Sequence, residues 1–222
     1  PIPVEGPPFI KGFNNPKYHD MVWIPGGPYV AGHFKSFDDE GLSGERSEAV
    51  VPMSGFWIDK YELHVPPRDL AATDDDALRA EKTAWNDQNA WTIDNKRTWA
   101  EAQSLCGQTG KRLCTEDEWE KACKGPDNSS YTYGDVFEEK RCPAGGYLPA
   151  YRANEHPACA SGYGVYNMGG GVVEWTSTPD EDRYVVKPGS PGDDAKSTRC
   201  TGRQDQAPGF FHSTVGIRCC AD

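Results

Sequence analysis

A glycine-rich segment in the second half of the chain places an amide and a carboxylate beside a backbone that bends easily. Residues 162 to 176 read Gly-Tyr-Gly-Val-Tyr-Asn-Met-Gly-Gly-Gly-Val-Val-Glu-Trp-Thr. Hard cations such as Ca²⁺ prefer oxygen ligands, and consecutive glycines let backbone carbonyls converge. Asn167 and Glu174 could therefore hold such a cation. The spacing alone favours a simpler interpretation, a glycine-rich turn before a buried strand in which Glu174 accepts backbone hydrogen bonds.

Other residues whose side chains could take part in catalysis do not form a known catalytic pattern. Asp193 and Asp194 could supply a general base, although a polar surface loop is the simpler interpretation of this pair. The histidines do not have the HxxxH or HxE spacing of non-haem iron ligands, and they stand at positions 19, 33, 64, 156 and 212. The chain also lacks a nucleophile elbow, a phosphate-binding loop and a dinucleotide fingerprint.

The cysteines indicate disulfides rather than a metal site. There are eight, at positions 106, 114, 123, 142, 159, 200, 219 and 220. None forms a CxxC pair or a Cys-His cluster with zinc-ligand spacing. We therefore expect an oxidising compartment, which means a secreted, periplasmic or cell-surface protein. The proline-rich start, from Pro1 to Pro8, is typical of a mature or trimmed N-terminus.

Composition limits the fold and the class of partner. A chain of 222 residues can bury one sizeable core, and 24 glycines with 18 prolines favour short strands over long helices. The formal net charge of −11 argues against nucleic acid as a partner. The same charge suits cation binding, although a solubilising surface explains it equally simply. No apolar stretch approaches the roughly 20 residues that a transmembrane helix needs, so we expect a soluble chain.

Two helices are predicted from their N-terminal capping boxes. Thr98-Trp-Ala-Glu101 should begin a helix that runs to about Cys106, and Thr115-Glu-Asp-Glu118 should begin one that ends at Gly125. In each box the threonine side chain accepts a first-turn N–H while the glutamate reaches back to the cap.

The remaining segments predict short strands and one insertion. Residues 21 to 30 indicate a hairpin around a Pro-Gly-Gly turn, and residues 50 to 63 contain at least one strand. Residues 66 to 95 are acidic and predict a surface insertion with a short helix near 77 to 82. We expect a proline- and glycine-rich lead-in over residues 1–20 and a single α+β domain over residues 21–222, with two short helices and little regular secondary structure.

Six motifs in this order resemble the formylglycine-generating enzyme (sulfatase-modifying factor) family. They cover about residues 21 to 220 and comprise Met21–Gly27, Phe56–Leu63, Trp99–Cys106, Gly110–Glu120, Tyr131–Asp135 and Tyr163–Trp175. The resemblance implies a variant of the C-type lectin fold with a surface groove. Cys114 stands where the family usually has proline.

The resemblance also implies a structural calcium ion. It assigns side-chain ligands to Asn167 and Glu174 and carbonyl ligands to Gly170 and Val172. A second calcium site of the family looks degraded here, because only Asn154 remains and the acidic loop that should follow it is missing.

Two disulfides are implied by the resemblance and two are chosen from the remainder. The implied pairs are Cys106 with Cys219 and Cys123 with Cys200. The other four cysteines allow three pairings, of which we favour Cys142 with Cys159 and Cys114 with Cys220.

The segment from Ser190 to Arg199 departs from the catalytic members of the family. Those members carry two cysteines there that bind copper, because Cu(I) prefers soft thiolates. The segment contains no cysteine in this chain, so we expect no copper and no formylglycine-generating activity.

Two function classes remain. The first is a noncatalytic, calcium-stabilised binding module that holds a protein, peptide or glycan in the former active-site groove. That groove would be lined by Ser190, Asp193, Asp194, Arg199 and Arg203. The second is an oxidative maturation enzyme that uses chemistry other than the cysteine–copper pair.

Overall fold

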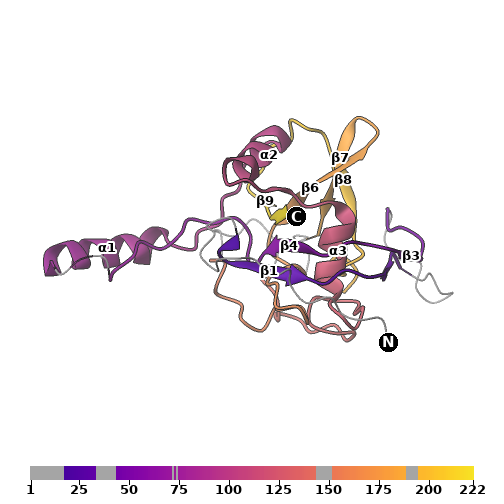
Figure 1. The fold of residues 1–222 in the computed structure, drawn as a ribbon, viewed down its shortest axis with the longest axis horizontal. Helices are drawn as coiled ribbons and strands as arrows, with labels where there is room; N and C mark the ends of the chain where they lie inside the picture. The colour runs from indigo at the N-terminus through magenta and orange to yellow at the C-terminus, as the bar shows by residue number, and fades with distance from the viewer. Residues whose placement is uncertain (1–17, 34–43, 72, 74, 144–151, 189–194) are drawn as a thin grey trace.

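The computed structural model describes residues 18–33, 44–71, 73, 75–143, 152–188 and 195–222. These residues form an α+β fold with short helices and many short strands (Figure 1). The lead-in expected over residues 1–20 lies almost wholly outside the described residues, and so do Ser190, Asp193 and Asp194. Of the helices in the described part of the chain, none has the length and apolar character that a bilayer crossing requires.

Two four-stranded sheets carry the fold. The first has the order β1-β4-β10-β5 and comprises β1 (Met21–Ile24), β4 (Phe56–Asp59), β10 (Cys219–Ala221) and β5 (Arg112–Leu113). The second has the order β8-β7-β6-β9 and comprises β8 (Gln204–Gln206), β7 (Arg183–Lys187), β6 (Val173–Asp180) and β9 (Val215–Ile217). Only Arg218 separates β9 from β10, so this residue lies where the two sheets meet.

The hairpin expected over residues 21 to 30 is wrong. The strands β1 and β2 (Tyr29–Ala31) belong to different sheets, because β1 pairs with β4 and β2 pairs with β3 (Ala49–Val51). At the turn, the Gly27 N–H donates to the Met53 carbonyl at 2.8 Å instead of crossing to β1. The tryptophan pair between β1 and β4, Trp23 opposite Trp57, favours that non-local pairing.

Both predicted capping boxes are present. They begin α2 (Trp99–Gln108) and α3 (Glu116–Lys124). The helix α3 ends at Gly125, whose φ of 68° is a conformation that glycine adopts without strain. Eight of the nine residues of α3 are buried, including three glutamates and two lysines. Such charges require ionic partners, and these connect α3 to the candidate site.

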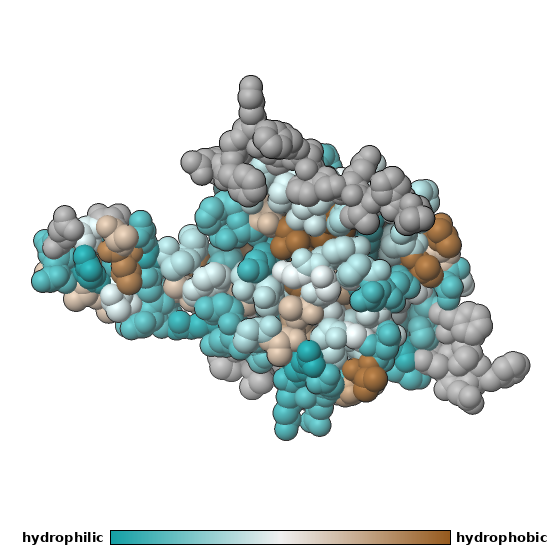
Figure 2. All heavy atoms as spheres, turned by 60° about the horizontal axis from the view of Figure 1, so that its bottom comes forward, coloured by the Kyte–Doolittle hydropathy of each residue, from teal (hydrophilic) through white to brown (hydrophobic). Residues whose placement is uncertain are grey.

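The longest helix of the described residues comes first in the chain and projects away from the rest of the fold (Figure 1). The helix α1 (Asp76–Asn89) spans 14 residues, whereas the sequence indicated a short helix near 77 to 82. It buries no residue. Together with residues 66–71, which precede it, this helix forms a helical arm (residues 66–71 and 75–89) that projects from one side of the molecule (Figure 1). Its visible surface is mostly hydrophilic (Figure 2).

Four disulfides join the core. The first core cluster lies against α3 and contains Trp119, Phe56 and Ile58, and the second lies against α2 and contains Trp175 and Ile217. The eight cysteines form the pairs that the sequence analysis named, which are Cys106–Cys219, Cys114–Cys220, Cys123–Cys200 and Cys142–Cys159. No cysteine is free. This density of disulfides is typical of an oxidising compartment.

Candidate functional site

Arg218 forms the centre of a buried group of charges below the glycine-rich segment. Its side chain is fully buried, and its guanidinium donates to the carbonyls of Asp59 at 3.0 Å and Tyr166 at 2.9 Å. Burial opposes the charged form of this guanidinium. Glu174 and Glu62 outweigh that effect and keep the pKa of Arg218 above its usual value. Arg218 is therefore a permanent internal cation.

Glu174 is the main anionic partner of Arg218. The guanidinium donates from Nη2 to Oε1 at 2.7 Å and from Nε to Oε2 at 2.9 Å, and the indole N–H of Trp119 donates to Oε2 at 2.6 Å. The sequence analysis offered backbone amides as alternative partners for this carboxylate, and the structure supplies side chains instead. A carboxylate has about four acceptor positions. A fourth bond runs from Nε to Oε1 at 3.2 Å, so each oxygen already has two donors and a cation at Glu174 would compete with Arg218 for Oε1.

Asn167 has an oxygen without a hydrogen-bond partner. Its Nδ2 donates to Glu62 Oε2 at 3.0 Å and to the Ala153 carbonyl at 2.9 Å. Those two acceptors fix the orientation of the amide, because the flipped form would turn its oxygen toward them. The buried Oδ1 then has no protein partner in the described residues. An unpartnered buried oxygen is costly, and a cation would satisfy it.

Several charged side chains gather around Arg218. Three carboxylates, Asp59, Glu62 and Glu174, lie near two cations, Arg218 and Lys111. Lys111 contacts Asp59 at 2.6 Å, whereas Glu62 lies 3.7 Å from Arg218. Burial raises the pKa of Asp59 in spite of Lys111.

These observations suit the ligand set that the family resemblance implies. In the described part of the chain, no three His, Cys, Asp or Glu side chains are arranged for a metal. A cation here would instead use the Asn167 amide, the Glu174 carboxylate and the carbonyls of Gly170 and Val172. Amide, carboxylate and carbonyl oxygens are the donor set that calcium prefers. Asn154, the remnant of the second family site, is exposed.

A second group of buried charges holds the chain on both sides of the segment without cysteines. Lys187 at the end of β7 is fully buried and lies 3.2 Å from Glu120 of α3. After the segment, Arg203 contacts Glu116 at 3.2 Å and Asp180 at 2.9 Å. Arg203 is therefore engaged in the interior of the fold, although the sequence analysis counted it as a groove residue.

Arg199 is the other groove residue that the structure describes. It is half-buried, and its Nη1 lies 3.2 Å from His33 Nε2. Both arginines are thus half-buried, with Arg203 contacting acidic residues and Arg199 lying beside His33.

Glu120 is the central anion of this second group. It contacts Lys187, Lys124 at 3.5 Å and Arg46 at 3.0 Å, and it accepts the Gly32 N–H at 2.6 Å. Burial would raise the pKa of this carboxyl, but these partners outweigh burial and lower the pKa to about 2. Glu120 therefore stays ionised and ties α3 to β7 and to the loop after β2.

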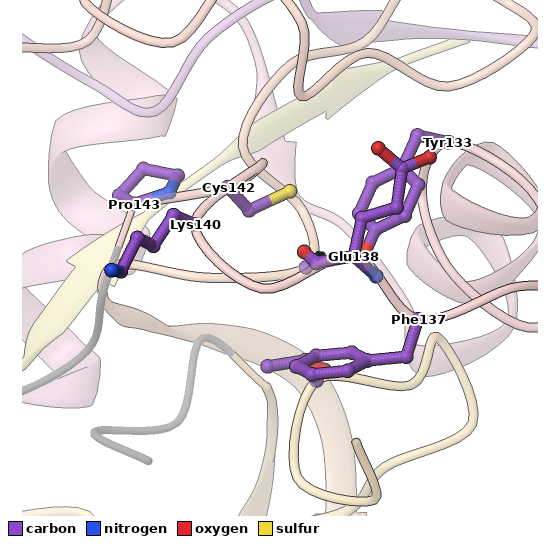
Figure 3. Close-up of a pocket in the computed structure, with 8 residues that line it drawn as sticks. Tyr133, Phe137, Glu138, Lys140, Cys142 and Pro143 are labelled. Atoms are coloured by element: carbon purple, nitrogen blue, oxygen red, sulfur yellow. Dashed lines mark hydrogen bonds between the residues drawn. The ribbon is translucent and has the colours of Figure 1, made fainter. Parts of the chain in front are cut away.

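A small pocket lies at the end of the segment without cysteines. Its volume is about 20 Å³, which is room for about one water molecule. The lining residues come from three parts of the chain and are Tyr133, Phe137, Glu138, Lys140, Cys142, Pro143, Gly169 and Thr198 (Figure 3). The pocket thus connects Thr198 with the Cys142–Cys159 disulfide and with the glycine-rich segment.

A larger open cleft of about 430 Å³ lies elsewhere on the molecule. Its lining includes residues 51 to 56 between β3 and β4, the start of α3 and Thr178. Its volume falls in the range of ligand sites. Its acidic residues already have arginine partners, because Asp117 pairs with Arg46 and Glu118 pairs with Arg112.

Sequence reasoning did not identify Arg218, Glu62 or Trp119 as parts of the site. A signal for the first two is nevertheless present. Arg218 interrupts the apolar run from Val215 to Ala221, and Glu62 lies within the aromatic stretch from residue 56 to 63. A charge inside such a run indicates a buried, paired charge.

The chain matches the family described as the sulfatase-modifying factor enzyme 1-like domain over residues 9–222. Among similar proteins, the inactive C-alpha-formylglycine-generating enzyme 2 of Bos taurus is 31% identical over 55% of this chain and 48% of its own length. The formylglycine-generating enzyme of Mus musculus is 32% identical over 56% of this chain and 43% of its own length. Hercynine oxygenase of Mycolicibacterium smegmatis is 27% identical over 71% of this chain and 45% of its own length. The chain thus spans about half the length of these relatives.

Solved structures share the fold. Treponema denticola variable protein 1 superposes with a TM-score of 0.66 at 15% identity, over 90% of this chain and 94% of the other. PvdO from Pseudomonas aeruginosa superposes with a TM-score of 0.66 at 15% identity, over 91% of this chain and 94% of the other. At this identity the likeness extends to the fold alone, which is the C-type lectin-like variant expected from the sequence.

Proposed function

Because the chain belongs to the sulfatase-modifying factor enzyme 1-like domain family, we propose that it is a noncatalytic, calcium-stabilised binding module. In this proposal the protein is exported to a secreted, periplasmic or cell-surface location. The region between Ser190 and Arg203 would hold a protein, peptide or glycan.

The observation that carries the proposal is the state of the cysteines. All eight are in disulfides, and none lies between Ser190 and Arg199. Catalytic relatives need a reactive cysteine pair there to bind copper. This chain has no thiol that could replace them, since even the neighbouring Cys200 is bonded to Cys123. The similarity to a relative named as inactive supports the same interpretation.

An assay for aldehyde formation tests the absence of catalysis. The chain, loaded with copper and supplied with oxygen, is incubated with a cysteine-containing peptide derived from a sulfatase. We expect no formylglycine in the peptide by mass spectrometry. Formation of formylglycine at the rate of a catalytic relative assayed in parallel would contradict the proposal.

A binding experiment tests the positive half of the proposal. The chain is screened against an immobilised peptide library and a glycan array. We expect Arg199→Ala to weaken the binding of any hit by at least tenfold, because Arg199 lies at the partly open end of the segment. Lys96→Gln, an exposed change elsewhere, should leave the affinity unchanged. A hit that binds both variants equally well would not use this region.

The calcium part of the proposal rests on Asn167. This residue carries a buried amide oxygen without a partner, and its φ of 64° is one that asparagine and glycine tolerate. When bound, the ion would supply positive charge beside Glu174 and Glu62 and hold the loop between Asn167 and β6. Its role would be structural.

Calcium-dependent stability tests this part. At a calcium concentration of 100 times its Kd, the free energy of unfolding should rise by about 2.7 kcal/mol. Asn167→Gly keeps the backbone conformation but removes the ligand, so the calcium effect should disappear. Asn154→Gly should retain it. A calcium effect that survives in Asn167→Gly would refute the assignment of this ligand.

A second candidate is an oxidative enzyme with different chemistry. The specific observation in its favour is the similarity to a protein named hercynine oxygenase. The two candidates differ in oxygen consumption. The binding module should show no oxygen uptake with copper or iron present, whereas stoichiometric uptake would favour the oxidase.

A further inference from the structure

The Cys142–Cys159 disulfide contacts the glycine-rich loop from both of its ends. On one side the Asn167 N–H donates to the Cys159 carbonyl at 2.9 Å. On the other side the Gly171 N–H donates to the carbonyl of Pro143, the residue after Cys142, at 3.0 Å. The two halves of the disulfide therefore hold the beginning and the middle of the loop from Asn167 to Glu174.

The loop and the disulfide also approach each other closely at Gly170. A Cβ on Gly170 would lie 2.4 Å from the Pro143 carbonyl oxygen and 3.0 Å from Cys142 Cβ. A Cβ on Gly169 would lie 3.5 Å from Cys142 Sγ. Only glycine allows this approach at Gly170, so movement of Cys142 must displace the loop.

Cys142 is the most accessible of the eight cysteines. Its exposed fraction is 9%, whereas the other seven are 0% or 1% exposed. It also lines the small pocket, where it lies between Lys140 and Tyr133 in the view of Figure 3. Thiol–disulfide exchange requires access of a thiolate to one sulfur. The Cys142–Cys159 disulfide is therefore the most open of the four to solvent.

Two cations lie next to the disulfide, each with an acidic partner. Lys140 and Arg141 directly precede Cys142. The Arg141 guanidinium donates to the carbonyl of Ala158 at 3.1 Å, which places its charge next to the residue before Cys159. Glu138 contacts Arg141 at 2.6 Å and offsets part of that charge, and Glu139, 3.9 Å from Lys140, offsets part of the charge of Lys140. Neighbouring cations stabilise thiolates and speed exchange.

The geometry points to Cys142–Cys159 as a site of thiol–disulfide exchange that controls the order of the glycine-rich loop. An external dithiol is the reductant. Its thiolate attacks Cys142 Sγ, forms a mixed disulfide and releases the Cys159 thiolate. The second thiol of the reductant then displaces Cys142. Two electrons pass from the dithiol to the protein, and the dithiol becomes a cyclic disulfide. The Cys159 and Cys142 thiolates, released in turn, take up the two protons that the dithiol loses, so both cysteines end as thiols. The other three disulfides stay closed.

Reduction kinetics test the first part. The native protein is treated with dithiothreitol, and free thiols are alkylated at timed intervals and mapped by mass spectrometry. Cys142 and Cys159 should become labelled at least tenfold faster than any of the other six cysteines. Arg141→Gln should slow this labelling, and Lys96→Gln should not. The inference is wrong if another pair opens as fast as this one, or if all four open together.

Hydrogen exchange tests the coupling to the loop. After selective reduction and alkylation, the amides of Asn167 and Gly171 should exchange at least tenfold faster by NMR, while the Ala102 amide in α2 keeps its rate. The double variant Cys142→Ser/Cys159→Ser should give the same pattern without alkylation. Unchanged protection of Asn167 and Gly171 in the alkylated protein would show that the disulfide does not control the loop.

Discussion

Single residues at the junction of the two sheets carry charges that are buried and therefore need ionic partners. Arg218 is fully buried and pairs with Glu174, which is 1% exposed. Removing one member of a buried pair leaves an uncompensated charge in a medium that cannot solvate it. The same logic applies to Glu120, which is surrounded by cations. These residues can be tested one at a time.

Arg218→Leu should lower the free energy of unfolding by about 3–5 kcal/mol, because Glu174 and Glu62 lose their shared cation. Urea denaturation measures this change. Arg183→Leu is the matched control, since it breaks an ion pair with Asp205 whose side chains are about 40% exposed. This control substitution should lower the free energy of unfolding by less than about 1 kcal/mol. Equal effects of both variants would mean that the central ion pair does not stabilise the fold.

Glu120 should make stability depend on acid pH. Its pKa is lowered in the folded state from 4.5 to about 2, so the folded state binds this proton less readily than the unfolded state. The resulting stabilisation is fully present above pH 4.5 and is lost as the pH falls toward 2. In Glu120→Gln the free energy of unfolding should vary less between pH 5 and pH 2, as measured by denaturant titration at each pH. Glu81→Gln, on the helical arm, should retain the wild-type dependence. If the free energy of unfolding of Glu120→Gln depended on pH as strongly as that of the wild type, the lowered pKa of Glu120 would not be the cause of that dependence.

At the scale of elements, local signals predicted the helices and non-local pairing decided the strands. The capping boxes at Thr98 and Thr115 are contained within four residues each, so the sequence was sufficient to locate both helices. The pairing of β1 with β4 depends on contacts about 35 residues apart in the chain, such as Trp23 with Trp57. A Pro-Gly-Gly sequence carries no information about such a distant contact, and the hairpin prediction was wrong for this reason.

The helical arm shows a different element-scale effect. The segment before α1 braces the helix, because the Arg68 guanidinium lies 4.0 Å from the Trp85 ring and Asn86 exchanges hydrogen bonds with the Arg68 backbone. These contacts lengthen the helix beyond what its sequence indicated. They lie within the arm, and none contributes to the core.

Replacing residues 68–88 by a short Gly-Ser linker should therefore leave the body intact. The backbone hydrogen bonds between Val65 and residues 91 and 92 remain at the base. We expect the free energy of unfolding to change by less than about 1 kcal/mol in urea denaturation, since α1 buries no side chain. A loss of several kcal/mol would show that the arm supports the core.

At the scale of the whole molecule, the chain has the fold of its family but not the cysteine pair of the catalytic members. The ordered motifs were enough to anticipate the family, the fold and the glycine-rich loop. The partners of that loop were not anticipated, because Glu62 and Arg218 are more than 150 residues apart in the chain and meet only in the folded state. The disulfides connect α2, α3 and β10 around this centre, while the segment without cysteines lacks the thiols of catalytic relatives.

Metal analysis of the chain purified without chelators tests this account most directly. We predict about one calcium ion per chain and no stoichiometric copper or iron, by mass spectrometry of the metals in the purified protein. That result would agree with a calcium-stabilised scaffold that has lost the copper chemistry of its family. Stoichiometric copper or iron with no calcium would contradict the account, because it would require a redox site in place of a structural one.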